Sequence, residues 1–511
     1  MKRLLARTLP FITIPFIISC VKTTSADLVI HNGEIHCNNV SSEVYDAMAV
    51  KDGVIIELGP EHQIMNKYQA EEYVDLKKKP VFPGLYDSHA YFYKTGFANK
   101  ILDLSGILTV EEIIIQINNI KTELVLATNL ESDLVNSQNL IDQINSSDKP
   151  IVLKSNNGYT ALVNIAASTK YDINHENGKI KNGLQNIWDK VSSESPSQKI
   201  ESLIMAQQIF TMNGVTTTTN LNSDVEIIKL LDSLSHEKVI QMRIHLYTDY
   251  QVLLNNPMIL ESLTSANIIL DGINLYIDGP ISSEQALLKD TNFYGNGSYG
   301  VQLIEDSIIE AAINFSLDNN LIIAFHCLGD SAIGLVKRHV KKSIAIENNL
   351  RFRIEHAQMF DPLDYDLLNR YYLIPSVQPN ESQNDFKFID SKFSPALKSE
   401  AYQYKSLKSQ LGLICFGSLS PLNPPSPFSQ MYLAQYLNSK YNSETLSRKE
   451  CFNALTIYPA LAFGDDQILG TLEAGKKGTF VILNDNPNET TKEKLKNITV
   501  ENTFIDGVKI Y

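Results

Sequence analysis

The segment Val81-Phe82-Pro83-Gly84-Leu85-Tyr86-Asp87-Ser88-His89-Ala90-Tyr91 carries the most information about the fold of this chain. Because alternate side chains of a strand share a face, Asp87, His89 and Tyr91 are expected to project together. A neutral imidazole binds zinc readily, whereas a phenol with a pKa of about 10 must first lose its proton. The segment therefore predicts a strand that carries one good metal ligand, His89, beside a weaker one, Tyr91.

Length and composition set the class of protein. With 511 residues, the chain is long enough for one large α/β barrel together with a smaller domain. Hydrophobic residues make up 43% and charged residues 20%, as in an ordinary globular protein. The formal net charge is −14, and the sequence has no basic stripe that could bind phosphates, so a nucleic-acid partner is excluded.

The N-terminal segment has the features of a bacterial lipoprotein signal. Lys2, Arg3 and Arg7 form a positive region, and the apolar run 9–18 that follows is too short to cross a bilayer. The next residues end in Cys20 and resemble a lipobox, in which cleavage precedes a cysteine that is then acylated. The sequence predicts a signal peptide over 1–20, acylation of Cys20, a linker over 21–26, and a bacterial cell-envelope protein attached to the membrane through its lipid alone. An ordinary secretory signal with a chance cysteine is the alternative.

Strand-rich segments lie at both ends of the chain. Short apolar runs with hairpin signals such as Asn32-Gly33 occupy residues 27–80, and similar runs occupy 466–511. Between them, residues 81–465 alternate apolar strands with helical periodicity, which is typical of a parallel sheet wrapped by helices. The expected fold is therefore α/β: a distorted (β/α)8 TIM-type barrel over 81–465, with a small composite β-domain built from both termini. The expected barrel strands include Pro150–Leu153, and the polar stretches 155–185 and 380–400 are expected to be loops near the barrel mouth.

Polar motifs follow several of the expected barrel strands. They read Asn274-Leu275-Tyr276-Ile277-Asp278-Gly279, His326-Cys327-Leu328-Gly329-Asp330, Arg353-Ile354-Glu355-His356-Ala357-Gln358 and Gly417-Ser418-Leu419-Ser420-Pro421. Together with the segment around His89, and in this order, these motifs resemble those of the amidohydrolase superfamily. The most similar branch, amidohydrolase family 3, contains N-substituted formamide deformylases and exoenzyme-regulatory-protein-like hydrolases.

The resemblance implies a metal site at the C-terminal mouth of the barrel, where active sites of this fold lie. His89, His326 and His356 occupy family ligand positions and are the predicted ligands of zinc or another divalent ion. Three further positions depart from the family pattern. Tyr91 stands in place of a second histidine, Asn274 in place of a lysine that is carboxylated and bridges two metals, and Leu419 in place of the aspartate that acts as the base.

Other polar residues are expected around the same mouth. Asp87 and Tyr159 would line a ligand pocket there, together with the three substituted positions. Asp278 and Asp330 are candidates for extra ligands or catalytic acids, although Asp-Gly and Gly-Asp after a strand also make turns and helix caps. Glu355 is expected to face away from the mouth, because it neighbours His356 on one strand.

Two functions remain open, and whether the protein is an enzyme remains open with them. Hydrolysis needs an ion to acidify water and a base to move its proton, and the family's base and two of its ligands are replaced. The sequence therefore favours a catalytically degenerate barrel, a pseudoenzyme that binds a small molecule at its mouth or serves as a scaffold, and zinc or another divalent metal is expected only if the three histidines are occupied. The alternative is an active hydrolase of non-peptide C–N bonds that uses a reduced metal site of His89, His326 and His356. A purely structural lipoprotein is a third class, but it leaves the barrel mouth unexplained.

Overall fold

The computed structural model describes residues 24–156, 159–180, 183–289, 298–343, 351–365, 373–436 and 443–511. The predicted signal peptide, Cys20 and the first part of the 21–26 linker lie outside these ranges. Among the described residues, no helix combines the length and the apolar character needed to span a bilayer.

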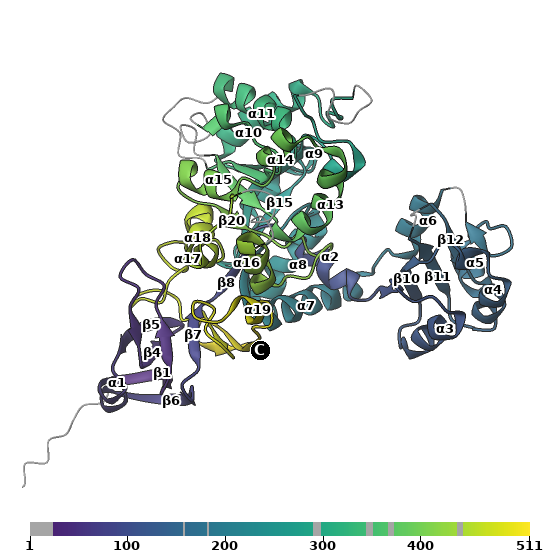
Figure 1. Ribbon diagram of the computed structural model, residues 1–511. Coiled ribbons are helices and arrows are strands. Elements are labelled where there is room, and N and C mark those ends of the chain that lie inside the picture. The colour runs from purple at the N-terminus through teal and green to yellow at the C-terminus, as the bar shows by residue number, and fades with distance from the viewer. Residues whose placement is uncertain are drawn as a thin grey trace, which may run out of the picture.

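An eight-stranded parallel sheet forms the centre of the molecule (Figure 1). Its order is β20-β19-β18-β17-β16-β15-β14-β8, and its two edges approach each other where Ser88 N donates to Phe416 O over 2.9 Å. The nearly closed sheet confirms the predicted α/β TIM-type barrel. The strands are β8 (Leu85–Asp87), β14 (Val215–Asn220), β15 (Arg243–Thr248), β16 (Ile268–Tyr276), β17 (Ile322–Cys327), β18 (Arg353–His356), β19 (Ile374–Val377) and β20 (Cys415–Phe416).

Helices cover the outside of the barrel. The side chains of each strand alternate between this outer face, which packs against the helices, and the opposite face. On β15, Ile244 and Leu246 pack into the large apolar core shared with the helices, whereas His245 and Tyr247 contact Asp271 on the other face. The polar stretch 380–400, expected to be a loop, is largely helical instead, in α13 and α14. The helices are α2 (Phe92–Ala98), α7 (Pro196–Met212), α8 (Val225–His236), α9 (Tyr250–Asn255), α10 (Asp306–Asn319), α11 (Asp330–Ser343), α13 (Ser382–Lys392), α14 (Pro395–Glu400), α15 (Tyr404–Leu411), α16 (Pro427–Tyr436), α17 (Arg448–Asn453), α18 (Ile457–Phe463) and α19 (Lys492–Leu495).

Two smaller sheets lie beside the barrel and contain the ends of the described chain (Figure 1). A six-stranded sheet, β23-β22-β21-β7-β2-β3, joins both ends because β7 pairs with β2 on one side and with β21 on the other. A four-stranded sheet, β5-β4-β1-β6, packs with the helix α1 (Glu61–Lys67). The strands are β1 (Thr24–His31), β2 (Glu34–His36), β3 (Val44–Tyr45), β4 (Ala47–Lys51), β5 (Val54–Gly59), β6 (Tyr68–Asp75), β7 (Pro80–Pro83), β21 (Phe480–Leu483), β22 (Val500–Ile505) and β23 (Val508–Lys509).

A separate α/β unit is inserted between α2 and α7, and Figure 1 shows it standing to the side of the barrel. Its five-stranded sheet has the order β13-β12-β11-β10-β9, and it has apolar clusters of its own. The interpretation of Pro150–Leu153 as a barrel strand is therefore wrong, because β11 pairs only within this sheet. Its elements are β9 (Leu102–Asp103), α3 (Val110–Asn119), β10 (Val125–Leu130), α4 (Gln138–Asn145), β11 (Ile151–Ser155), β12 (Ala161–Val163), α5 (Ile165–Tyr171), β13 (Lys179–Ile180) and α6 (Leu184–Val191).

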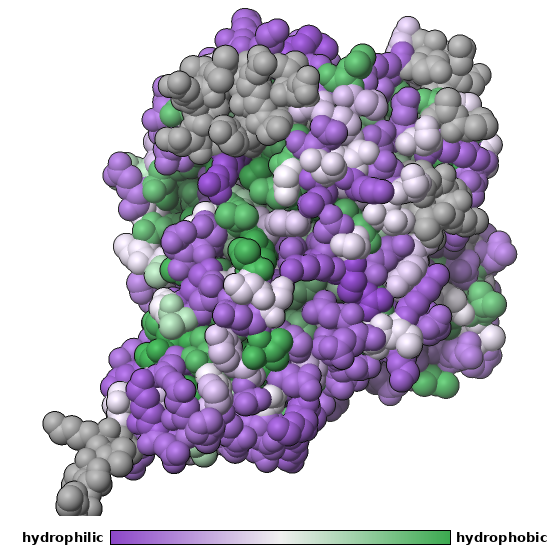
Figure 2. Space-filling view, turned by 60° about the vertical axis from the view of Figure 1, so that its left-hand side comes forward, coloured by the Kyte–Doolittle hydropathy of each residue, from purple (hydrophilic) through white to green (hydrophobic). Residues whose placement is uncertain are grey.

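The surface is mainly hydrophilic on the face shown in Figure 2, where apolar residues form separate small groups. This agrees with a composition in which charged residues make up 20% of the chain. Nothing on that face resembles a single large apolar interface.

Candidate metal centre

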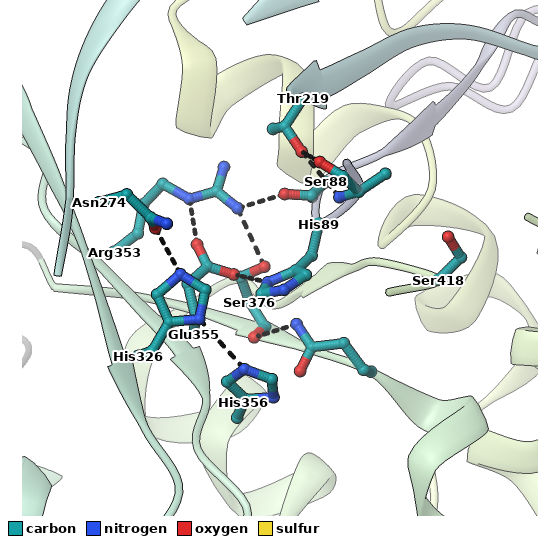
Figure 3. Close-up of polar contacts among 12 residues, drawn as sticks. Ser88, His89, Thr219, Asn274, His326, Arg353, Glu355, His356, Ser376 and Ser418 are labelled. Atoms are coloured by element: carbon teal, nitrogen blue, oxygen red, sulfur yellow. Dashed lines mark hydrogen bonds and ion pairs between the residues drawn. The ribbon is translucent and has the colours of Figure 1, made fainter. Parts of the chain in front are cut away.

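Three histidines meet at the C-terminal ends of the barrel strands. His89 follows β8, His326 lies near the end of β17, and His356 ends β18. Their potential ligand atoms all lie within 4.8 Å of one another, and the three rings are turned toward a common centre in Figure 3. All three side chains are buried, so water does not compete freely for their nitrogen atoms. We refer to them below as the histidine trio.

His89 is oriented by a buried ion pair. Its Nδ1–H donates to Glu355 Oε2 over 2.7 Å, and Arg353 Nε donates to the other oxygen of Glu355 over 2.6 Å. Burial would raise the pKa of Glu355, but Arg353 and His89 outweigh it and hold the pKa well below its usual range. A carboxylate can only accept a hydrogen bond, so Nδ1 carries the proton and His89 Nε2 is left with a lone pair. That Nε2 atom is buried and has no hydrogen-bond partner.

His356 is oriented in the same way by Glu381, the last residue of a short 3-10 turn, Pro379–Glu381. His356 Nδ1–H donates to Glu381 Oε2 over 3.0 Å, and Gln358 Nε2 donates to the same oxygen over 3.0 Å. The lone pair of His356 Nε2 therefore faces the centre of the trio, 3.2 Å from His326 Nδ1.

His326 is oriented by an amide. Its Nε2–H donates to Asn274 Oδ1, and the two amide protons of Asn274 go to Asn222 Oδ1 over 2.6 Å and to the Tyr276 hydroxyl over 3.1 Å. These contacts fix the amide, because a flipped Asn274 would set its oxygen against the oxygen of Asn222. His326 Nδ1 is thus the third lone pair that faces the centre.

The three inward lone pairs fit a divalent cation. Three neutral imidazoles with their outer N–H groups bonded to oxygen atoms form a usual zinc donor set, in which the outer partners fix the tautomers. A proton shared between His326 and His356 would satisfy those two nitrogens, but it would leave the buried Nε2 of His89 without a partner. A cation held by all three residues satisfies every one of the inward atoms.

Asp87, Gly417 and Leu419 pack directly against His89. Leu419 is buried with a φ of +63°, and its backbone N–H donates to His89 O over 2.8 Å. Asp87 Oδ1 accepts from Ser418 N over 2.9 Å, and burial raises the pKa of Asp87 to about 6. Gly417 allows this close approach, because a Cβ there would lie 2.3 Å from His89 Cβ.

Asp278 and Asp330 bind backbone amides. Asp278 accepts from Leu287 N, Leu328 N and Gly329 N over 2.8 to 2.9 Å. Asp330 opens α11 and accepts from Lys289 N and Ser331 N. Both carboxylates therefore hold loops around the mouth. Tyr159 is not part of this group, since it lies in the inserted unit and is 80% exposed.

The structure adds residues that the sequence patterns did not reveal. Glu355 was expected to face away from the mouth, yet it contacts His89 because it stands in register with His326 on the neighbouring strand. Strand alternation fails at this point because His356 and the next residue have φ values of +72° and +44°, which turns the end of the strand. Glu381, Tyr276 and Asn222 were missed as well, since only the fold brings them close to the trio.

Comparisons with known proteins agree with this fold. The chain is 25% identical over 541 residues to Protein LONG AFTER FAR-RED 3 of Arabidopsis thaliana, covering 95% of this chain and 92% of that protein. It superposes with a TM-score of 0.79 on an uncharacterized metal-dependent hydrolase from Pyrococcus furiosus, at 19% identity, covering 90% of this chain and all of the other. A similar hydrolase from Pyrococcus horikoshii gives 0.79 at 20% identity, covering 91% and 99%. The model of the amidohydrolase family matches residues 72–511, and the chain therefore belongs to the amidohydrolase family.

Proposed function

We propose that this protein is a metal-dependent hydrolase of non-peptide C–N bonds, with one divalent ion, zinc or a similar metal, on His89, His326 and His356. The carrying observation is that Glu355, Asn274 and Glu381 take the outer protons of the trio, so that all three lone pairs converge. The motif resemblance to formamide deformylases supports amides or formamides as substrates. A bound ion in such a site polarises a carbonyl group and acidifies water.

The chain's own residues prepare the site for this task. The ion pair between Arg353 and Glu355 is completely buried, and Arg353 also donates to Ser88 O over 2.5 Å and to Ser376 Oγ over 3.0 Å. These bonds tie the ends of three strands to His89, which limits the movement of its ring. Rigid placement of the ligands is what a catalytic metal site requires.

A degenerate barrel that binds a small molecule or serves as a scaffold is the second candidate. Leu419 favours it, because a leucine at the position expected for the base cannot accept a proton from water. Among the described residues, the carboxylates that accept hydrogen bonds from the rings of the trio are those of Glu355 and Glu381, and both also accept a second hydrogen bond. A base must be free to accept a proton from water. Asp87, two residues before His89, is a candidate for the missing base. Its Oδ2 atom is buried without a partner, and burial raises the pKa of Asp87 to about 6.

Metal content and hydrolysis together separate the two candidates. The purified protein should contain about one zinc per chain and should hydrolyse members of a panel of simple N-acyl and N-formyl amines. His326→Ala and His356→Ala should lose both properties, whereas His236→Ala, at an exposed histidine on α8, should lose neither. Zinc binding without hydrolysis of any member of the panel would favour the degenerate barrel, and a wild-type protein that takes up no zinc would refute the proposed metal site.

We further propose that Cys20 is acylated and attaches the protein to the bacterial cell envelope. The support is the order of positive, apolar and lipobox-like residues in the first twenty positions. Cys20→Ser should move the protein from the membrane fraction to the soluble fraction of cells that express the full-length chain. Retention of this variant in the membrane fraction would place the attachment elsewhere.

A further inference from the structure

Two of the substituted family positions belong to one hydrogen-bonded group. Asn274 donates to the Tyr276 hydroxyl over 3.1 Å, and that hydroxyl lies 2.9 Å from the hydroxyl of Tyr91. Asn222 donates to the same Tyr276 oxygen over 2.8 Å. The residues that replace the expected lysine and the second histidine are therefore connected through Tyr276. We call these four residues the tyrosine relay.

The number of donors and acceptors fixes the direction of the relay. A phenolic oxygen has one proton to donate and accepts at most two hydrogen bonds. The Tyr276 oxygen accepts from the amides of Asn222 and Asn274, so its own proton must go to the oxygen of Tyr91. The Tyr91 proton then has no acceptor among the described residues.

The relay lies on the outer side of the histidine trio. The ring of Tyr91 is 6.0 Å from the ring of His89, and the ring of Tyr276 is 4.3 Å from the ring of His326, measured between centroids. Asn222 is exposed, whereas Tyr91 and Tyr276 are partly buried. A molecule that reaches the trio from the Asn222 side therefore meets the two hydroxyl groups first.

The surroundings of the relay suit an oxygen that carries negative charge. A phenol, with an ordinary pKa of about 10, keeps its proton at neutral pH, so Tyr91 can act as a neutral donor. The exposed Lys94 ammonium lies 4.9 Å from the centre of the Tyr91 ring, and among the described residues it has no carboxylate partner.

We propose that the Tyr91 hydroxyl donates a hydrogen bond to the carbonyl oxygen of the ligand, and that Asn222, Asn274 and Tyr276 hold it in the donating orientation. This inference rests on the proposed function, which supplies the carbonyl group. Negative charge grows on that oxygen when water attacks the carbonyl carbon, and a fixed donor stabilises it. Tyr91 makes and breaks no covalent bond in this role, and Tyr276 acts on the ligand only through Tyr91.

Acetohydroxamate, a small carbonyl-containing chelator, is a suitable probe. Its dissociation constant would be measured by calorimetry on the zinc-loaded full-length protein and on three variants, with zinc content measured in parallel. Tyr91→Phe should keep its zinc and weaken binding about tenfold, the usual effect of one lost hydrogen bond near charge. Tyr276→Phe should weaken binding about threefold, because the Tyr91 proton is then free to turn. Tyr93→Phe is the matched control, since its hydroxyl donates to Glu194 instead, and it should bind as the wild type does.

The outcomes separate the two proposals. Wild-type affinity in zinc-loaded Tyr91→Phe or Tyr276→Phe would overturn the relay and leave the metal site standing. A wild-type protein without zinc would overturn the proposed function, and the relay would fall with it. If substrates of the amide panel are turned over, Tyr91→Phe should lower kcat far more than it raises KM, because the hydrogen bond strengthens as charge develops.

Discussion

Asn274 shows how much one amide side chain can do in this site. Its oxygen fixes the tautomer of His326, and its nitrogen orients Tyr276. Because the Tyr276 hydroxyl also contacts the Tyr91 hydroxyl, Asn274 and Tyr91 belong to one hydrogen-bonded group.

Replacement of Asn274 by leucine should weaken zinc binding without unfolding the barrel. Leucine has a similar volume but cannot accept from His326 Nε2, so the tautomer that presents Nδ1 to the metal is no longer fixed. Loss of such an outer partner usually costs about 10- to 100-fold in metal affinity. The affinity would be measured by competition with a chromogenic zinc chelator. Tyr93→Phe, whose hydroxyl contacts Glu194 and no residue of the trio or the relay, should bind zinc normally; equal affinities for all three proteins would contradict the role of Asn274.

Helices α2 and α7 approach each other closely in the outer layer of the barrel. Gly96 on α2 faces the backbone of α7, and a Cβ at position 96 would lie 1.8 Å from Ser202 O. Only glycine permits this distance between the helix axes. Gly334 on α11 differs, because a Cβ there would meet its nearest atom at 3.9 Å, the end of the Arg338 side chain.

Alanine at these two helical glycines should therefore have opposite effects on stability. Gly96→Ala should lower the free energy of unfolding by about 1–3 kcal/mol, because the helices must move apart. Gly334→Ala should raise it by about 0.5–1 kcal/mol, because alanine restricts the unfolded helix segment and clashes with nothing. Urea unfolding of both variants tests this, and a stabilised Gly96→Ala would show that the two helices are not in close contact.

The barrel was predictable from the sequence because its strand signals are local, and the trio was predictable because the motifs that carry it resemble those of a known family. Strands such as Ile322–Cys327 have the apolar character of a buried parallel strand, and the histidines follow at recognisable positions. The inserted sheet was not predictable, since an apolar run such as Ile151–Ser155 is equally compatible with either sheet and only pairing distinguishes them. The place of Glu355 depends on register between strands and on a left-handed residue after it, and neither is visible in a hydrophobic pattern.

A buried charge cluster connects the barrel with the segment that leads to the C-terminal strands. Asp465 follows α18 and accepts from Arg243 Nε over 2.9 Å, from the Tyr86 hydroxyl over 3.2 Å and from His245 Nε2 over 3.0 Å. His245 Nδ1 also lies 2.8 Å from Asp271. Burial would lower the pKa of His245, but Asp271 and Asp465 together outweigh it and raise the pKa to about 9.

The stability of the whole molecule should consequently fall in mildly alkaline solution. A raised folded-state pKa means that His245 contributes its full stabilisation below the ordinary histidine pKa of about 6.5 and loses it as the pH rises through about 9. The contribution is on the order of 3 kcal/mol. Urea unfolding between pH 6.5 and 9 should show this decline in the wild type and in the exposed control His236→Gln, but much less of it in His245→Gln. Parallel curves for the wild type and His245→Gln would mean that His245 is neutral in the folded protein.

The inserted unit leaves the barrel and returns to it at almost the same point. Lys100, just after α2, donates to Glu194 Oε1 over 2.9 Å and to Gln198 O over 2.8 Å, at the start of α7. In topological terms the whole unit is the loop of a helical hairpin, so its length makes little difference to the barrel. Loop-closure entropy grows only slowly with length, so the barrel tolerates an insertion of this size at small cost. We therefore expect the barrel to keep the scaffold that positions the histidine trio when the unit is shortened, exchanged or removed.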